Sequence, residues 1–210
     1  MGKITALRQG KNKENRVNLY LDGKFAFSMA QVKAKREGLS VGLELTGNRL
    51  ESLMKSLKIS RCLETAYHYL SYRPRSEAEL RERLHKRIFA DEQIEAVITT
   101  LKEQHLLDDQ KFAEFWKENR EAFNPRSRWL TGRELAKKGV DTEVISQVVA
   151  GIDEDESAYQ AAANRATRFA SCEYDEFRQK IGSYLQRRGF SYSVINRAIK
   201  KVWGEIKRKE

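Results

Sequence analysis

An internal repeat constrains this chain more than any other feature of its sequence. The triplets Pro74-Arg75-Ser76 and Pro125-Arg126-Ser127 are identical, lie 51 residues apart and hold both prolines of the 210-residue chain. The same step carries Leu84 onto Leu135, and a step of 50 carries Leu135 onto Leu185. A period near 50 residues predicts an array of similar units, and an array favours an extended binding surface over a single catalytic pocket.

The residues that follow the three leucines define the phase of the repeat. The block Leu135-Ala-Lys-Lys-Gly-Val matches Leu185-Gln-Arg-Arg-Gly-Phe. Apolar pairs then lie nine and thirteen residues past each leucine in the second and third copies: Val144 and Val148, Val194 and Ala198. In the first copy, Ile94 and Ile98 lie ten and fourteen residues past Leu84. We therefore expect one inserted residue in the first copy.

Composition narrows the class of protein. Charged residues make up 33% of the chain, and no apolar stretch approaches the roughly 20 residues of a membrane span. The N-terminus carries no apolar signal-peptide core. Cys62 and Cys172 are isolated, and His68, His85 and His105 lack a second ligand at metal-binding spacing. We expect a cytoplasmic monomer with reduced thiols, no metal, no cofactor and no membrane partner.

The net charge of +10 is distributed unevenly along the chain. Residues 1–59 carry 12 basic and 5 acidic side chains, residues 60–167 carry 17 and 20, and residues 168–210 carry 11 and 5. Two basic ends therefore flank a middle that is slightly acidic. This pattern favours a polyanionic partner such as nucleic acid, or an assembly that contains it, although a basic composition also occurs in proteins that bind neither.

The first 58 residues predict a small module with a β-hairpin. Asn18-Leu-Tyr-Leu and Lys24-Phe-Ala-Phe-Ser alternate apolar with polar or small residues, and Asp22-Gly23 between them suits a type I′ turn. Ile4-Thr-Ala-Leu predicts a third strand, and residues 9–16 a polar, mobile loop. A short helix over 30–37, ending at Gly38, and another over 46–58 would complete the module.

From about residue 60 the apolar period is that of a helix. We expect a helix ending before Pro74, one with Ser76 as N-cap and Glu79 as its capping-box partner, one capped by Asp91 and one starting at Asp108 or Asp109. Later helices are expected over about 127–138, 141–150, 155–170, 174–188 and 191–207. The fold class is therefore mainly α: three tandem three-helix repeats in an elongated array. The units are residues 59–122, 123–170 and 171–210, preceded by the β-hairpin module of residues 1–58.

Basic side chains gather near the same place in each copy. Because the leucine stripe fixes the buried face of each helix, we expect these side chains to point outward and to form a basic track for phosphates or acidic patches. The candidate track is Arg73, Arg75, Arg81, Arg83, Lys86 and Arg87; Arg126, Arg128, Arg133, Lys137 and Lys138; Arg178, Arg187 and Arg188; and Arg197, Lys200 and Lys201. Solvated helix faces with internal ion pairs are the alternative explanation, since glutamates lie among the arginines.

The block Tyr69-Leu-Ser-Tyr-Arg-Pro-Arg-Ser-Glu-Ala-Glu-Leu-Arg-Glu-Arg-Leu84 resembles the signature of the RecX family of regulators of the RecA recombinase. The resemblance extends through Leu106-Leu-Asp-Asp-Gln-Lys-Phe-Ala113, the later copies and Leu21-Asp-Gly-Lys-Phe-Ala-Phe-Ser28. It implies three three-helix repeats that bind the RecA filament on single-stranded DNA and inhibit strand exchange, ATP hydrolysis and coprotease activity. Its implied roles are recombination, DNA repair and the SOS response. Trp129-Leu-Thr-Gly132 departs from the first copy by placing a glycine inside a helix.

Three functions stay open at this point. The first is a non-enzymatic regulator of the RecA filament, and the second is an independent DNA- or RNA-binding helical-repeat protein. The third, an enzyme with an unrecognised site, is the weakest, because the chain has neither a phosphate-binding Gly-rich loop nor a nucleophile elbow. We therefore expect no catalytic residue.

Overall fold

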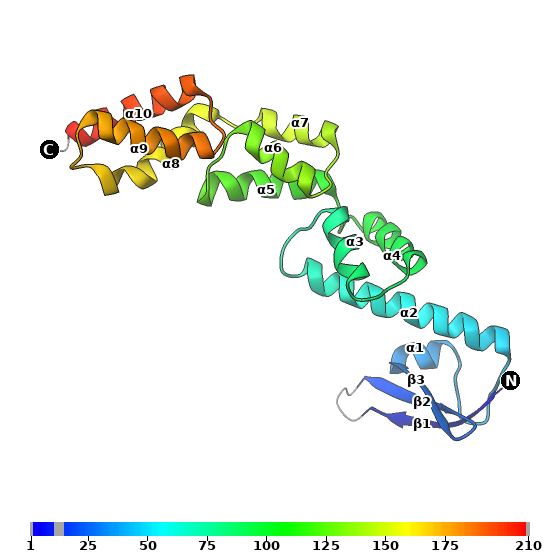
Figure 1. Ribbon diagram of the computed structural model, residues 1–210. Coiled ribbons are helices and arrows are strands. Elements are labelled where there is room, and N and C mark those ends of the chain that lie inside the picture. The colour runs from blue at the N-terminus through cyan, green and yellow to red at the C-terminus, as the bar shows by residue number, and fades with distance from the viewer. Residues whose placement is uncertain (1, 11–14, 209–210) are drawn as a thin grey trace. The chain divides into compact units, whose positions relative to one another are not determined.

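The computed structural model describes residues 2–10 and 15–208, which form a small antiparallel sheet followed mostly by helices (Figure 1). The chain divides into two compact units, one up to Thr65 and one from Ala66 onward. Of the helices among the described residues, none combines the length and the apolar character that crossing a membrane requires.

The sheet has four antiparallel strands in the order β3-β2-β1-β4. Their bounds are β1, Gly2–Gln9; β2, Arg16–Leu21; β3, Lys24–Ala30; and β4, Glu44–Leu45. Asp22 and Gly23 have φ values of 48° and 79°, the positive pair that a type I′ turn requires, so the predicted hairpin is confirmed. The predicted loop over 9–16 falls largely on residues 11–14, outside the described part of the chain.

One face of the sheet packs against two helices, α1 (Gln31–Arg36) and the start of α2 (Gly47–Leu70). Ile4 and Leu19 from the strands are fully buried, and Leu53 and Leu57 from α2 complete the core of this unit. Gly38, at φ 66°, follows the end of α1 as the sequence predicts. Separate helices before and after residue 58 were expected, but α2 is continuous because it contains no proline and its only glycine is its first residue.

The second unit consists of the end of α2 and eight further α-helices. They are α3 (Glu77–His85), α4 (Asp91–Glu103), α5 (Asp109–Phe123), α6 (Arg128–Lys137), α7 (Thr142–Ala150), α8 (Glu154–Ala166), α9 (Tyr174–Arg187) and α10 (Tyr192–Lys207). A short 3₁₀ helix, η1 (Thr167–Phe169), follows α8. The predicted mainly helical, three-repeat fold is confirmed.

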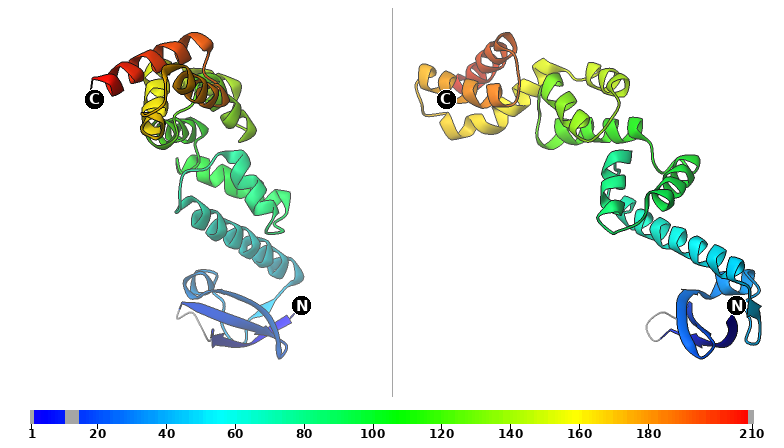
Figure 2. Two further views of the ribbon diagram at one scale, coloured as in Figure 1. Left: turned by 60° about the vertical axis from the view of Figure 1, so that its left-hand side comes forward. Right: turned by 45° about the vertical axis from the view of Figure 1, so that its right-hand side comes forward.

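Helix packing defines where each repeat begins. Helix α5 packs with α6 and α7, and α8 packs with α9 and α10, so α5 and α8 are the first helices of their groups. The yellow, orange and red helices α8, α9 and α10 lie side by side in Figures 1 and 2. The predicted units 59–122, 123–170 and 171–210 instead place α5 and α8 with the preceding helices. A helix pattern shows where a helix lies but not which neighbour it packs against.

The register of the repeat also differs from the sequence prediction in one detail. The residues that precede α4, α7 and α10 are Ala90, Asp141 and Ser191, which are separated by 51 and 50 residues. These are the same steps that relate the leucines, so the expected insertion in the first copy is wrong. Ala90, rather than Asp91, is the N-cap residue of α4.

The three leucines occupy equivalent environments. Leu84, Leu135 and Leu185 are fully buried, each near the end of the second helix of its repeat. The carbonyl of each accepts a hydrogen bond from the N–H five residues later, at 3.4, 3.2 and 3.3 Å. The residue before that donor has a positive φ in every copy: 62° at Ile88, 75° at Gly139 and 85° at Gly189. This shared helix ending confirms the repeat.

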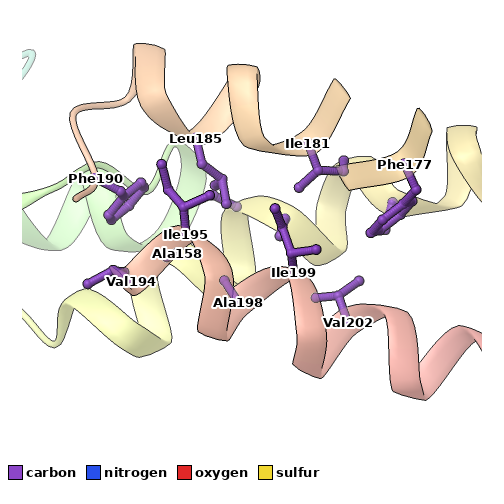
Figure 3. Close-up of a cluster of buried hydrophobic side chains, with 13 residues drawn as sticks. Ala158, Phe177, Ile181, Leu185, Phe190, Val194, Ile195, Ala198, Ile199 and Val202 are labelled. Carbon is purple, nitrogen blue, oxygen red and sulfur yellow. The ribbon is translucent and has the colours of Figure 1, made fainter. Parts of the chain in front are cut away.

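The third repeat shows how the apolar stripes close a core. Phe177, Ile181 and Leu185 from α9 face Ile195 and Ile199 from α10 (Figure 3). On α8 the buried positions are Ser157 and four alanines, and these small residues allow that helix to approach the other two closely. Trp203 packs on the edge of this core, with its ring centroid 5.0 Å from that of Phe177.

Successive repeats meet at a contact that we term a joint. The first joint comprises Ser76, Asp109, Lys138 and Gly139. The buried hydroxyl of Ser76 caps α3 by accepting from the Glu79 N–H at 3.1 Å, and it donates to the Lys138 carbonyl at 2.6 Å. Asp109, the first residue of α5, accepts from the Glu77 N–H at 2.8 Å. The second repeat therefore satisfies the N-terminus of α3 in the first.

The second joint, comprising Ser127, Glu154, Arg188 and Gly189, repeats this arrangement. Ser127 is buried, caps α6, and its N–H donates to the Arg188 carbonyl at 3.1 Å. Glu154, the first residue of α8, accepts from the Arg128 N–H at 3.0 Å. The two Pro-Arg-Ser triplets thus carry the serines of the two joints.

Glycine is required at the joints for space as well as for its conformation. A Cβ atom on Gly139 would lie 2.4 Å from the Cβ of Ala78, and one on Gly189 would lie 2.5 Å from the Ser127 hydroxyl. Both distances are below any van der Waals contact, and both glycines have positive φ. Inside α6, Gly132 serves a related purpose, because a Cβ there would lie 3.3 Å from Ile145.

We predict that Gly139→Ala lowers the free energy of unfolding of the helical unit by more than the roughly 1–2 kcal/mol expected from a positive φ alone. The excess comes from the clash with Ala78. Urea unfolding followed by circular dichroism measures the change. The double variant Ala78→Gly/Gly139→Ala removes the clashing atom and is the matched control. Recovery of stability in the double variant is expected, whereas strictly additive losses would show that the two residues do not meet.

Candidate partner-binding surface

The structure separates the predicted basic track into two groups. Twelve of its members have a hydrogen-bonding or ion-pairing partner inside the protein: Arg73, Arg75, Arg81, Lys86, Arg87, Arg126, Arg128, Lys138, Arg178, Arg188, Arg197 and Lys201. The other five are Arg83, Arg133, Lys137, Arg187 and Lys200. All five are exposed, so they are the members best placed to meet a partner.

Lys138 and Arg73 belong to an ion-pair cluster around Glu79. The Glu79 carboxylate accepts two hydrogen bonds from Arg73, at 2.9 and 3.1 Å, and one from Lys138 at 2.5 Å. Its side chain is only 16% exposed. Burial opposes ionisation, but the hydrogen bonds from Arg73 and Lys138 outweigh it, so the pKa of Glu79 lies below its ordinary value. Glu79 therefore links the two repeats and is not the predicted capping-box partner of Ser76.

A second carboxylate of low exposure, Glu134, is 15% exposed and binds basic residues of the second repeat. It accepts from Arg120 at 2.7 Å and from the Trp116 indole N–H at 2.9 Å, and it is paired with Arg126. Lys138 also lies over the ring of Trp116, 4.2 Å from its centroid. Arg126 therefore contributes to the core of this repeat and is not available as a free surface charge.

Arg81 and Arg188 show two further structural uses of predicted track residues. Arg81 is paired with Glu77, which precedes it by one helical turn, and with Glu95 on α4, so it bridges α3 and α4. Arg188 is paired with Asn124 and donates to the Pro125 carbonyl at 2.7 Å within the second joint. Reversing the charge of Arg188 would disrupt the fold as well as any surface.

Asp109 combines a capping role with an unusual electrostatic environment. Burial raises the pKa of its carboxyl above the ordinary value, despite the hydrogen bond from the Glu77 N–H. Glu154 holds the equivalent place in the second joint. That Asp109 and Glu154 would cap helices of the preceding repeat was not predicted from the sequence. The only sequence feature that indicates this role is a carboxylate at the first position of α5 and of α8.

The remaining exposed cations lie at related positions in the repeat. Lys137 and Arg187 both lie two residues past the buried leucine of their copy, and neither side chain has a partner among the described residues. Lys86 holds the same position in the first copy but is paired with Glu82. Lys200, on α10, is also exposed and unpaired among the residues described.

Two of the exposed arginines of the track that have no hydrogen-bonding or ion-pairing partner among the described residues lie over aromatic rings. Arg133 lies 5.0 Å from the ring centroid of Trp129, which is 61% exposed, and Arg83 lies 6.0 Å from that of Tyr69. Trp129 also approaches Gly189 in the second joint, so it packs between two repeats. A guanidinium over a ring keeps its charge accessible to solvent.

Among the described residues, the side chains that could bind a metal ion or act as a nucleophile do not form a site. No group of three or more His, Cys, Asp or Glu side chains within residues 2–10 and 15–208 is arranged to hold a metal ion. Cys62 is fully buried, and burial raises the pKa of its thiol to about 11. Asp153 is the N-cap of α8 and accepts from the Glu156 N–H at 3.0 Å.

The fold defines a class: a helical-repeat protein with an N-terminal sheet. Four domain models of one family match in order along the chain. They are the regulatory protein RecX N-terminal domain at residues 2–46 and the first, second and third RecX three-helix domains at residues 62–101, 108–149 and 153–199.

Full-length relatives agree with these matches. The regulatory protein RecX of Bacillus licheniformis is 31% identical over 205 residues, covering 96% of this chain and 78% of the relative. The regulatory protein RecX of Clostridium perfringens (strain SM101) is 27% identical over 207 residues, and the match covers 96% of this chain and 97% of the relative. The chain therefore belongs to the RecX family of regulatory proteins.

Solved structures support the fold. A crystal structure of a regulatory protein RecX superposes with a TM-score of 0.68 at 24% identity, covering 93% of this chain and 98% of the other. RecX from Lactobacillus salivarius gives a TM-score of 0.59 at 24% identity, covering 69% of this chain and 96% of its own.

We predict that Glu79→Gln lowers stability at neutral pH by about 1–3 kcal/mol, because Arg73 and Lys138 lose their charged partner. Since the folded pKa of Glu79 is lowered, its stabilisation is present above the ordinary value and is lost as pH falls through the folded value. The variant should therefore lose less stability than the parent between about pH 5 and pH 3. Urea unfolding across this range measures both effects.

Glu82→Gln is the matched control for this prediction. Glu82 is paired with Lys86 within α3 but is 64% exposed, so solvent screens the pair. Little change in stability is expected from it. Equal behaviour of the two variants would contradict the linking role of Glu79.

Proposed function

We propose that this protein is a non-enzymatic regulator that binds the RecA–single-stranded DNA filament and inhibits strand exchange, ATP hydrolysis and coprotease activity. The observation that carries the proposal is membership of the RecX family along nearly the whole chain, sheet and all three repeats included. In this proposal the protein acts in recombination, DNA repair and the SOS response, as a cytoplasmic monomer without a cofactor.

Charge supports the same proposal. The exposed cations of the track are Arg83, Arg133, Lys137, Arg187 and Lys200, and they recur along the repeats. A filament that presents phosphates and acidic patches at regular spacing matches a repeated array of cations. Of the twelve track residues with internal partners, some pair within one repeat, such as Lys86 with Glu82, and others, such as Lys138 and Arg188, contact a neighbouring repeat.

The second candidate function is independent binding of DNA or RNA. Two features support this function: the same exposed cations, and the short turns that connect the helices of each repeat as in helix-turn-helix proteins. Binding to single-stranded DNA, measured with and without RecA and nucleotide, separates the two functions. Binding that requires RecA favours the regulator, and binding that is equally tight without RecA favours the independent DNA-binding protein.

We predict that reversing Lys137, Arg187 and Lys200 together to glutamate weakens inhibition of the RecA ATPase on single-stranded DNA, with the fold retained. Each change is on an exposed helix surface, where substitutions usually alter stability by about 0.5 kcal/mol or less. The parent's inhibition should also weaken as salt rises, and the variant should be less sensitive to salt. Thermal unfolding is measured alongside.

The matched control reverses Lys35, Arg36 and Lys58, which are exposed residues of the N-terminal unit. It changes the net charge by the same amount, so it separates a local surface from the general electrostatic field. Full inhibition by a folded Lys137/Arg187/Lys200 variant would exclude these residues from the binding surface. Equal loss in both variants would assign the effect to net charge alone.

A further inference from the structure

The solvent face of the N-terminal sheet carries two ordered rows of side chains. In the register of β1, β2 and β3, Ala6 pairs with Tyr20 and Tyr20 with Phe25. The neighbouring row consists of Arg8, Asn18 and Ser28. Ile4, Leu19, Phe27 and Met29 alternate with these residues and point into the core formed with α1 and α2, so both rows lie on the opposite face.

The first row presents aromatic surface to solvent. Phe25 is 58% exposed, a high value for a phenylalanine in a strand. Its ring centroid lies 5.9 Å from that of Tyr20, at an interplanar angle of 77°. The Arg8 guanidinium lies over the ring of Tyr20, 5.1 Å from its centroid. Arg8, Tyr20 and Phe25 therefore form a continuous strip of planar groups across three strands.

The second row is suited to polar recognition beside this strip. Asn18 has amide groups that can donate and accept, and its side chain has no partner among the described residues. The Arg16 guanidinium donates a hydrogen bond to the backbone carbonyl of Ser28 at 3.1 Å. Ser28 is small and polar, so a polar row lies beside the aromatic strip.

The charge of this unit favours a polyanion over an apolar protein partner. Residues 1–65 include 13 basic and 6 acidic side chains. Lys24, next to Phe25, is exposed and has no side-chain partner among the described residues. The nearest carboxylate along the chain, Asp22, already accepts from the Lys3 N–H at 3.0 Å. Exposed aromatic rings among cations are typical of surfaces that stack the bases of single-stranded nucleic acid.

We propose that this sheet face binds single-stranded DNA directly, with bases stacking on Phe25 and on the Arg8–Tyr20 pair. The proposal does not depend on RecA or on the exposed cations of the repeats. A cross-strand aromatic pair also stabilises a hairpin. That role does not account for the exposure of Phe25 or for the cations around it, and the experiment below separates the two roles.

The test measures binding of the full chain, without RecA, to two fluorescent oligomers by anisotropy. One is an oligothymidylate, and the other is an abasic strand with the same number of phosphates. Phe25→Leu keeps an apolar cross-strand partner but removes the ring. We expect it to weaken binding to the oligothymidylate about tenfold, as loss of one stacked base does, and to leave binding to the abasic strand unchanged. The salt dependence should stay the same because no phosphate contact is lost.

Two variants complete the design. Phe25→Tyr retains a ring and should bind like the parent. Phe123→Leu makes the same change at an aromatic residue that is 81% exposed on α5, and it should have no effect. Photocrosslinking to an oligomer containing 5-iodouridine, followed by mass spectrometry, should locate the crosslink at Tyr20 or Phe25.

Three results would overturn the proposal. One is unchanged binding by a folded Phe25→Leu variant, and another is an equal loss on the abasic strand, which would indicate a general effect on the fold. The third is a dimer seen by analytical ultracentrifugation that disappears with Phe25→Leu, which would make this face an interface between copies. Failure of RecA inhibition in the repeat variants would leave these measurements unaffected, so the two proposals fail separately.

Discussion

The helical unit depends on a buried serine that caps a helix in one repeat while it contacts the end of a helix in the next. Ser76 and Ser127 are fully buried, and in each joint a glycine without a Cβ leaves room for the contact: Gly139 beside Ala78, and Gly189 beside Ser127. A buried hydroxyl is stabilising only when its hydrogen bonds are made. The Ser76 hydroxyl donates to the Lys138 carbonyl of the next repeat, and the Ser127 N–H donates to the Arg188 carbonyl, so these bonds at the N-termini of α3 and α6 form only when the repeats are stacked.

This constraint explains why three repeats contain only two Pro-Arg-Ser triplets. In the second and third copies, the end of the second helix packs on the serine of the preceding repeat. The first copy follows the N-terminal sheet unit and not another repeat, and Ile88, at the position of Gly139 and Gly189, is 94% exposed. Among the described residues no further repeat packs on the third copy, and its α9 begins at Tyr174 with Glu173 as N-cap in place of a serine. Terminal units of an array are released from the contacts that define the internal ones.

Local chemistry made much of the fold predictable, and contacts between distant residues limited the rest. The Asp22-Gly23 turn, the Ser76 and Ser127 caps and the glycine helix endings follow from a few adjacent residues. The pairing of Glu79 with Lys138 joins residues 59 apart and depends on how repeats stack. The candidate surface was therefore only partly predictable: the sequence indicates where cations are dense but not which of them have carboxylate partners.

Ion pairing also changes what the net charge means. Lys138 and Arg126 are held by glutamates of low exposure, so their charges are largely neutralised where they lie and contribute little to the field around the protein. The excess of cations then resides in exposed side chains of the repeats and in the N-terminal unit. A polyanion that contacts only a few such cations is held weakly by charge, since each phosphate contact contributes separately. In the proposed complex, the exposed ring of Phe25 adds affinity for single-stranded DNA through base stacking, which salt does not screen. The ring contacts bases, whereas the cations contact phosphates.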